Sequence, residues 1–279
     1  MRRRILTFEG MLNDRMFITS LKAADMVIHQ PVKLSYDIWM VVHQGGVRVA
    51  SNLAVTDVTV NTFSVFGFGK IVEILNVTDD FEADVFILSE QFQKDLSISE
   101  LLSLKVHFNT SPTIALNKET MEALTDYHRM AARIIQLEGN PYKWQSLLCL
   151  TQAFYYGGGY YIFKNFTHAE TNDSIVTRFM LLVEQYAVRE REIPFFADKL
   201  CLTPKYLSKL IQKKTGHTAK DVISHYVLLQ SRALLLNTDY NIQQISDMLH
   251  FPSQSVFGKF FKQGTGLSPK QYRDEFARN

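Results

Sequence analysis

The sequence has little of what a secreted or disulfide-rich protein needs. Only two of its 279 residues are cysteine, Cys149 and Cys201, and they lie far apart. Two distant thiols are typical of a reducing compartment and give neither a disulfide framework nor a metal-ligand spacing. The basic start Met1-Arg2-Arg3-Arg4 is not followed by an apolar segment, so no secretory signal is predicted. We therefore expect a cytoplasmic protein.

The patterns of common enzyme sites are also missing. There is no Gly-x-Ser-x-Gly and no P-loop, and Gly67-Phe68-Gly69 lacks the third glycine of a dinucleotide site and is interpreted as a hairpin end. A metal-dependent β-barrel enzyme needs clustered histidines with a carboxylate nearby. Here the histidines of the first half are dispersed and without such partners: His29, His43, His107 and His128. No catalytic residue, metal site or cofactor is predicted.

One uncharged stretch has the length of a membrane span. Residues 144–163 contain no acidic or basic side chain. Gly157-Gly158-Gly159 and several Gln, Ser and Thr residues dilute the hydrophobicity, which favours a helix that ends at a glycine-rich break, and no membrane contact. The tyrosines on either side of the glycines either line a ligand pocket or flank a flexible joint. The joint is favoured because consecutive glycines resist helix formation.

Charge is unevenly distributed along the chain. The composition is that of a globular protein, with 46% hydrophobic and 21% charged residues and a net charge of +2. Residues 1–173 have 15 Lys and Arg against 19 Asp and Glu, whereas residues 174–279 have 15 against 9, a net charge of +6. A basic last part joined to an acidic first part indicates that the last part meets a polyanion.

The last hundred residues contain an internal repeat. Residues 206–216 and 256–266 match at an offset of 50 in their apolar positions, in Lys209 and Lys259, and in the closing Thr-Gly. Each copy predicts a short helix, a turn and a longer helix, over about 193–216 and about 242–266. Thr203 and Ser253 are the expected N-caps of the longer helices, and Gly216 and Gly266 follow their ends.

The polar faces of the two longer helices contain no acidic residue. On the first, Lys205, Lys209 and Gln212 share one side, and on the second Ser255, Lys259 and Lys262 repeat that spacing. Lys, Gln and Ser are side chains that read base edges in the major groove. One such face is usually only solvated, but two in matching register favour DNA binding. A connecting helix over about 219–236, roughly 27 Å long, would place both helices near successive turns of the groove, about 34 Å apart, if the DNA bends.

These residues resemble the AraC/XylS family of bacterial transcription regulators. The resemblance covers residues 173–278 and is most specific over Phe251–Arg273, and it extends to Ala197–Leu200 and Thr203–Ser208. The chain departs from the family where Cys201 and His250 replace the usual turn glycines, which strains the turns if φ is positive there. Gly258 and Val256 also replace residue types common in the family.

The resemblance implies two classes of DNA-contacting residue. The base-reading positions would be Lys205, Ser208, Lys209, Gln254, Ser255 and Lys259. The phosphate-contacting positions would be Thr203, Gln212, Lys213, Lys214, Ser253, Lys262 and Lys270.

The first 163 residues predict a second domain. Runs rich in Val, Ile, Phe and Thr indicate a small antiparallel β-barrel or sandwich over about 1–110, similar to the family's cupin-like barrel in strand rhythm: 37–43, 47–51, 55–66, 70–76 and 84–89. Gln44-Gly45-Gly46 is read as a hairpin turn. Helices over 118–138 and 142–156 form a helical hairpin that either dimerises, as the resemblance implies, or only covers the barrel. Residues 164–173 are the expected linker, and Ser174 begins a helix over 175–187.

The fold class expected is therefore α+β with two domains, a cupin-like β-barrel or sandwich and an all-α domain of two helix-turn-helix units. The function expected is a one-component regulator that binds promoter DNA, as a homodimer that responds to a small effector and contacts RNA polymerase. Two alternatives stay open: a ligand-independent regulator whose N-terminal domain only assembles or binds a protein partner, and a cupin-type enzyme with a DNA-binding tail.

Overall fold

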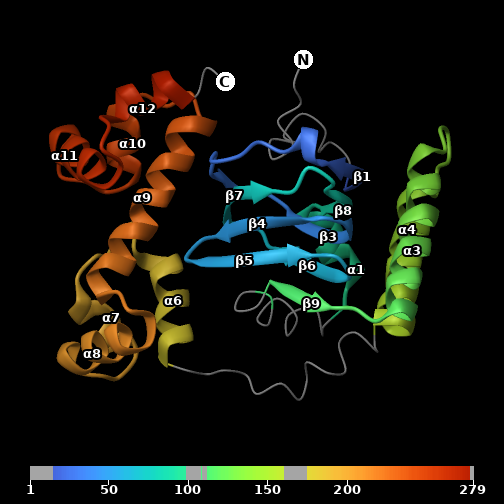
Figure 1. Cartoon of the computed structure of the whole chain (residues 1–279), viewed down its shortest axis with the longest axis horizontal. Helices are drawn as coiled ribbons and strands as arrows, with labels where there is room; N and C mark the ends of the chain where they lie inside the picture. Colours follow the sequence, from blue (N-terminus) through green and yellow to red (C-terminus); the bar gives the residue numbers. More distant parts are fainter. Residues whose placement is uncertain (1–14, 99–107, 109–111, 160–174, 277–279) are drawn as a thin grey trace. The chain divides into compact units, whose positions relative to one another are not determined.

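The computed structural model describes residues 15–98, 108, 112–159 and 175–276 (Figure 1). The expected linker 164–173 and the cap Ser174 lie outside these residues. The chain divides into two compact units, one formed mainly by Met1–Thr171 and the other mainly by Asn172–Asn279. No helix of the described part is long and apolar enough to cross a bilayer, and the described part of 144–163 forms a helix and a short π-helical turn.

The first unit is a sandwich of two β-sheets, which confirms the predicted fold class. The first sheet has the strand order β1-β8-β3-β6-β9, formed by Met16–Lys22, Glu82–Leu88, Asp37–Gln44, Thr62–Phe66 and Thr113–Ala115. The second has the order β2-β7-β4-β5, formed by Val32–Lys33, Ile71–Val77, Gly46–Ser51 and Ala54–Thr59. The registered pairs β1–β8, β3–β8, β3–β6, β6–β9 and β4–β7 are antiparallel.

Strand β8 lies between two cores, which explains its almost continuous hydrophobic sequence. Ala83, Val85 and Ile87 face the core between the sheets. Phe86 and Leu88 face a second core on the other side of the first sheet, beneath the helices. Because successive strand residues point to opposite faces, a strand buried on both sides has no polar alternation.

Among the described residues, three helices pack against the outer face of the first sheet. They are α1 (Glu90–Leu96), α3 (Lys118–Gln136) and α4 (Lys143–Phe154). Asn117 caps α3, its side chain accepting a hydrogen bond from the Thr120 amide at 2.8 Å. Figure 1 shows α3 and α4 side by side as the expected helical hairpin. The glycines after α4 do not break the chain at once, because Tyr155–Gly159 continue it as the π-helical turn.

Three predictions about the strands and their turns are wrong. Residues 55–66 form β5 and β6 instead of one strand, because Asn61 has a left-handed φ of 60° and turns the chain from one sheet to the other. The turn at Gly45, with φ of 66°, joins β3 and β4, but these strands belong to different sheets and do not form a hairpin. The same is true of β6 and β7 on either side of Gly67-Phe68-Gly69. Strand β1 was not predicted.

The second unit consists of helices around one core. The helices are α6 (Ile175–Tyr186), α7 (Ile193–Lys199), α8 (Pro204–Thr215), α9 (Ala219–Asn237), α10 (Ile242–Met248), α11 (Gln254–Thr265) and α12 (Pro269–Phe276). Helix α9 is the expected connecting helix, and Val222, Ile223, Tyr226, Val227, Leu235 and Leu236 on it are all buried in that core. It contacts α6 and α8 as well as α10, α11 and α12.

Candidate nucleic-acid interface

The two longer helices of the repeat, α8 and α11, have the same construction. Thr203 caps α8 and accepts from the Tyr206 amide at 3.2 Å, while Ser253 caps α11 and accepts from the Val256 amide at 3.3 Å. Gly216 and Gly266 end them with φ of 78° and 80°, in the left-handed conformation that suits glycine. Two short helices, α7 and α10, precede them, so each copy is a helix-turn-helix.

The buried faces of these helices also correspond. Leu207 and Ile211 of α8 are fully buried, as are Phe257 and Phe261 of α11. In both helices these residues are i and i+4 neighbours, which fixes the opposite face toward solvent. In each helix-turn-helix unit, the polar face of the longer helix therefore lies opposite the buried pair and points toward solvent.

Nearly all sequence-predicted DNA-contacting side chains are exposed. Those in and beside α8 are Thr203, Lys205, Lys209, Gln212, Lys213 and Lys214, and those in and beside α11 and α12 are Ser253, Gln254, Ser255, Lys259, Lys262 and Lys270. Among the described residues none of these lysines forms an ion pair, and neither α8 nor α11 contains an acidic residue. The charge of each lysine is thus available to an external anion.

Ser208 differs from the other predicted base-reading residues. It is half-buried at the edge of the face, and its hydroxyl donates to the Pro204 carbonyl at 2.8 Å. A hydroxyl that donates to the backbone can still accept a hydrogen bond. Ser208 is thus placed to accept from a base or from a neighbouring side chain.

The matches to known proteins fall on this repeat. A family model described as a helix-turn-helix domain matches residues 196–275. The Msm operon regulatory protein of Streptococcus mutans is 35% identical over 83 residues, which cover 30% of this chain and 30% of that protein. The xylose operon regulatory protein of Escherichia coli is 28% identical over 102 residues, which cover 37% of this chain and 26% of that protein. The chain thus matches about a quarter of the length of that relative.

The C-terminal unit is an AraC/XylS-family helix-turn-helix domain. The predicted resemblance is confirmed for this unit, because the matching family model is a helix-turn-helix domain and the matching relatives are regulatory proteins. Among solved structures, ToxT from Vibrio cholerae matches over 94% of this chain and 99% of its own, with 13% identity and a TM-score of 0.45.

The turns of this AraC/XylS domain are strained, as their sequence predicted. Cys201 and His250, which stand where the family usually has glycine, have φ of 56° and 53°. Side chains with a Cβ seldom adopt this conformation, because the Cβ crowds the backbone. Both turns therefore depend on the surrounding packing to hold their shape.

Two exposed apolar residues on α8 and α11 were not among the residues predicted from the sequence to contact DNA. Tyr206 and Val256 occupy equivalent positions, three residues after the caps, and are 52% and 47% exposed. An apolar side chain in a major groove contacts thymine methyl groups. Their position in the repeat was visible in the sequence, but only their exposure distinguishes them from the core residues one place further along.

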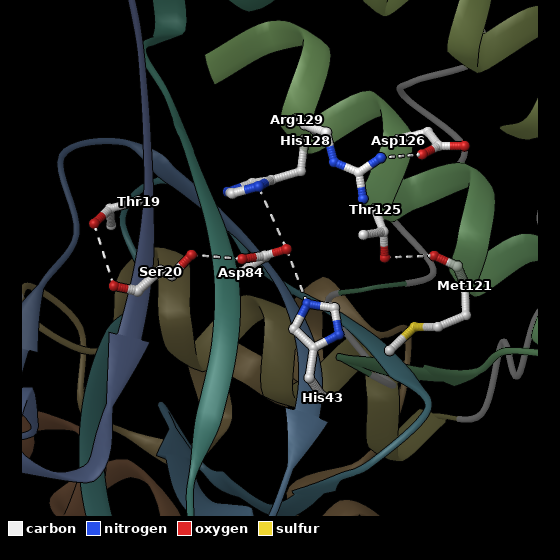
Figure 2. Close-up of polar contacts among 9 residues, drawn as sticks. All are labelled: Thr19, Ser20, His43, Asp84, Met121, Thr125, Asp126, His128 and Arg129. Atoms are coloured by element: carbon white, nitrogen blue, oxygen red, sulfur yellow. Dashed lines mark hydrogen bonds and ion pairs between the residues drawn. The ribbon is translucent and has the colours of Figure 1, made fainter. Parts of the chain in front are cut away.

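The N-terminal sandwich contains a polar cluster that the sequence did not predict (Figure 2). His43 Nε2 lies 2.8 Å and His128 Nδ1 lies 3.3 Å from Oδ2 of Asp84, whose Oδ1 accepts a hydrogen bond from Ser20 at 2.7 Å. The expectation that these histidines lack a carboxylate partner is wrong, because β3, β8 and α3 bring together residues that are distant in sequence. In the described part of the chain no group of three His, Cys, Asp or Glu residues has a geometry that could hold a metal ion.

Burial and charge act in opposite directions on His128. Desolvation lowers the pKa of this imidazole below its ordinary value, with a smaller contribution from the nearby His43. The Asp84 carboxylate and the backbone of Thr19 partly offset this effect by favouring the charged form. Since the net shift of the pKa is downward, burial outweighs the effect of Asp84 and favours a neutral His128.

Proposed function

We propose that the chain is a bacterial one-component transcription regulator that reads specific promoter DNA with two helices, α8 and α11. The observation that carries this proposal is the pair of capped helices with equivalent, exposed, acid-free faces. Cationic faces on the second helix of a helix-turn-helix enter the major groove, where their side chains reach base edges.

The exposed residues divide into two roles. The residues that would read bases lie on the outward faces of α8 and α11 or at their edge. They are Lys205, Ser208, Lys209, Gln254, Ser255 and Lys259. The phosphate contacts would come from Thr203, Gln212, Lys213, Lys214, Ser253, Lys262 and Lys270. Phosphate contacts add salt-dependent affinity without sequence preference, whereas base contacts supply discrimination.

The N-terminal sandwich would respond to an effector. A small cavity between its sheets is lined only by apolar side chains: Leu21, Met26, Ile38, Met40, Val47, Val49, Phe66, Val72, Ile74 and Val85. An apolar cavity stays dry and accepts apolar molecules, and the flexible methionines at its wall can move to enlarge it. The effector would thus be a small apolar molecule or carry an apolar end.

The helical hairpin would form the contact between two copies of the chain. Met130 on α3 and Leu137, the residue that follows the end of α3, are both exposed, and the exposed Tyr142 follows in the connecting turn. Exposed apolar residues grouped in this way mark an interaction surface. A homodimer would present four reading helices to promoter DNA in the cytoplasm. Bound there, it would contact RNA polymerase.

Selection from a pool of random duplexes tests the proposed function. The full chain is expected to enrich one sequence with a strong preference over competitor DNA at moderate ionic strength. Replacement of Lys209 and Lys259 together by alanine is expected to abolish the enrichment. Enrichment of no sequence by the wild-type chain would contradict the proposal.

The alternative is a regulator without an effector. Thermal unfolding of the full chain with and without small apolar compounds distinguishes it from the effector-responsive regulator. A ligand that binds only the folded state raises the midpoint by mass action. A rise that is lost in the cavity-filling variant Val85→Phe supports the effector site. No rise with any compound supports the alternative, in which the sandwich only assembles the protein.

A further inference from the structure

Arg191 directly precedes the first helix-turn-helix unit in the sequence but contacts the second unit in space. It lies in the loop between α6 and α7, two residues before α7 begins. Its Nη2 donates a hydrogen bond to the carbonyl of Leu249, the C-cap residue that follows α10, and another to the Val188 carbonyl in its own loop at 3.4 Å. Its guanidinium carbon stands 3.9 Å from the centre of the Phe251 ring.

The residues that Arg191 contacts enclose the turn of the second unit. Leu249 and Phe251 lie on either side of His250, whose positive φ of 53° makes this turn strained. Phe251 in turn packs against Phe257 and Phe260 of α11, with ring centres 5.2 and 5.1 Å apart. A continuous set of contacts therefore runs from the loop before α7 through this turn to the second reading helix.

The chemistry of the contact requires both partners to be in place. Arg191 is half-buried, and desolvation lowers the pKa of its guanidinium, which nevertheless stays charged at physiological pH. The cation contacts one carbonyl at a helix C-terminus, where positive charge is favoured, the Val188 carbonyl of its own loop, and the face of one aromatic ring. Lysine would keep the charge but not the flat shape that stacks on the ring while donating sideways to the carbonyl.

We propose that Arg191 is a positioning residue that fixes the second reading helix relative to the first, so that both meet DNA at one spacing. The proposal rests on the proposed function, because it assigns a role within the same DNA-reading surface. Two linked units bind one duplex strongly only when their geometry lets each unit reach its own DNA segment at the same time. If the contact is lost, the units remain joined through α9 but tolerate a wider range of spacings.

The experiment uses the full chain and the duplex obtained by selection. It also uses duplexes in which one to five base pairs are inserted between the segment that α8 contacts and the segment that α11 contacts. The wild type is expected to lose affinity about tenfold or more on the inserted duplexes. Arg191→Lys and Arg191→Ala are expected to bind the selected duplex more weakly and to discriminate less between spacings. Arg189→Ala is the matched control, because Arg189 is exposed in the same loop.

A second variant, Phe251→Leu, removes the ring but keeps an apolar side chain. It is expected to lose spacing discrimination as Arg191→Lys does, and the double variant is expected to lose little more, because the two residues act through one contact. Reduced thermal stability with unchanged spacing discrimination would overturn the proposal, since it would show a merely structural role. A wild-type chain that prefers no duplex would instead refute the proposed function.

Discussion

At the residue scale, the account depends on lysines that have no protein partner among the described residues. Lys209 stands at the centre of the outward face of α8, opposite the buried Leu207 and Ile211, whereas Lys213 is one turn nearer the helix end. A side chain near the start of a reading helix reaches bases, while one near its end is better placed for the phosphate backbone. Replacing each lysine should therefore change DNA binding in a different way.

Lys209→Ala is expected to weaken binding to the selected duplex by about 1–3 kcal/mol and to relax preference at one or two base pairs, because it removes a base contact. Competition binding with every single-base variant of the site measures this. Lys220→Ala, an exposed lysine at the start of α9, is the control. An unchanged preference at every position would exclude Lys209 as a base reader.

Lys213→Ala is expected to weaken binding to all sequences equally and to reduce the slope of log affinity against log salt by about one unit. Titrations at several salt concentrations, on the selected duplex and on random DNA, provide the slope. If discrimination between the two duplexes falls while the slope stays the same, the assignment to phosphate is wrong.

His128 gives the sandwich a pH-dependent stability. Its folded-state pKa is lower than the ordinary value of 6.5, so the unfolded chain takes up the proton more readily. Its contribution to the free energy of unfolding is fully present above about pH 6.5 and is lost as the pH falls through the lower folded value. His128→Asn keeps a donor toward Asp84 without the titration. Denaturant unfolding at pH 7.5 and 5.5 should show a smaller loss for the variant, and equal losses would contradict this reading.

At the element scale, the helices were easier to predict than the strands. Caps, closing glycines and apolar spacing are local signals, and they placed α3, α8, α9 and α11 with ends close to those observed. The sheet partners of β3, β4 and β6 depend on contacts between distant residues, so a turn such as Gly45 gave no indication that the chain changes sheet. The His43–Asp84–His128 cluster was missed for the same reason.

The caps themselves allow a test at this scale. Ser253→Ala is expected to destabilise the domain by about 0.5–2 kcal/mol, because the Val256 amide loses its acceptor. Ser255→Ala, two residues on and exposed, is the matched control and should change stability little. Chemical denaturation of the full chain measures both, and equal effects would show that the cap contributes nothing specific.

At the scale of the whole molecule, the proposed function assigns DNA reading to the repeat and the response to an effector to the sandwich. The two helix-turn-helix units could be predicted from the sequence, and so could most of the candidate DNA contacts. The reason is that duplication places equivalent residues in equivalent positions. The contact of Arg191 with Leu249 and Phe251 could not be derived in this way, since it joins the units across an interval of nearly sixty residues and has no counterpart in the repeat pattern.

Hydroxyl-radical footprinting of the full chain on its selected duplex tests the central claim most directly. Two reading helices in successive turns of the major groove predict, for each chain, two protected segments on one face of the duplex, about 10 base pairs apart. Alanine at Lys209 should remove protection from one segment, and alanine at Lys259 should remove it from the other. A single protected segment that both variants weaken equally would contradict the claim that the two helices read DNA together.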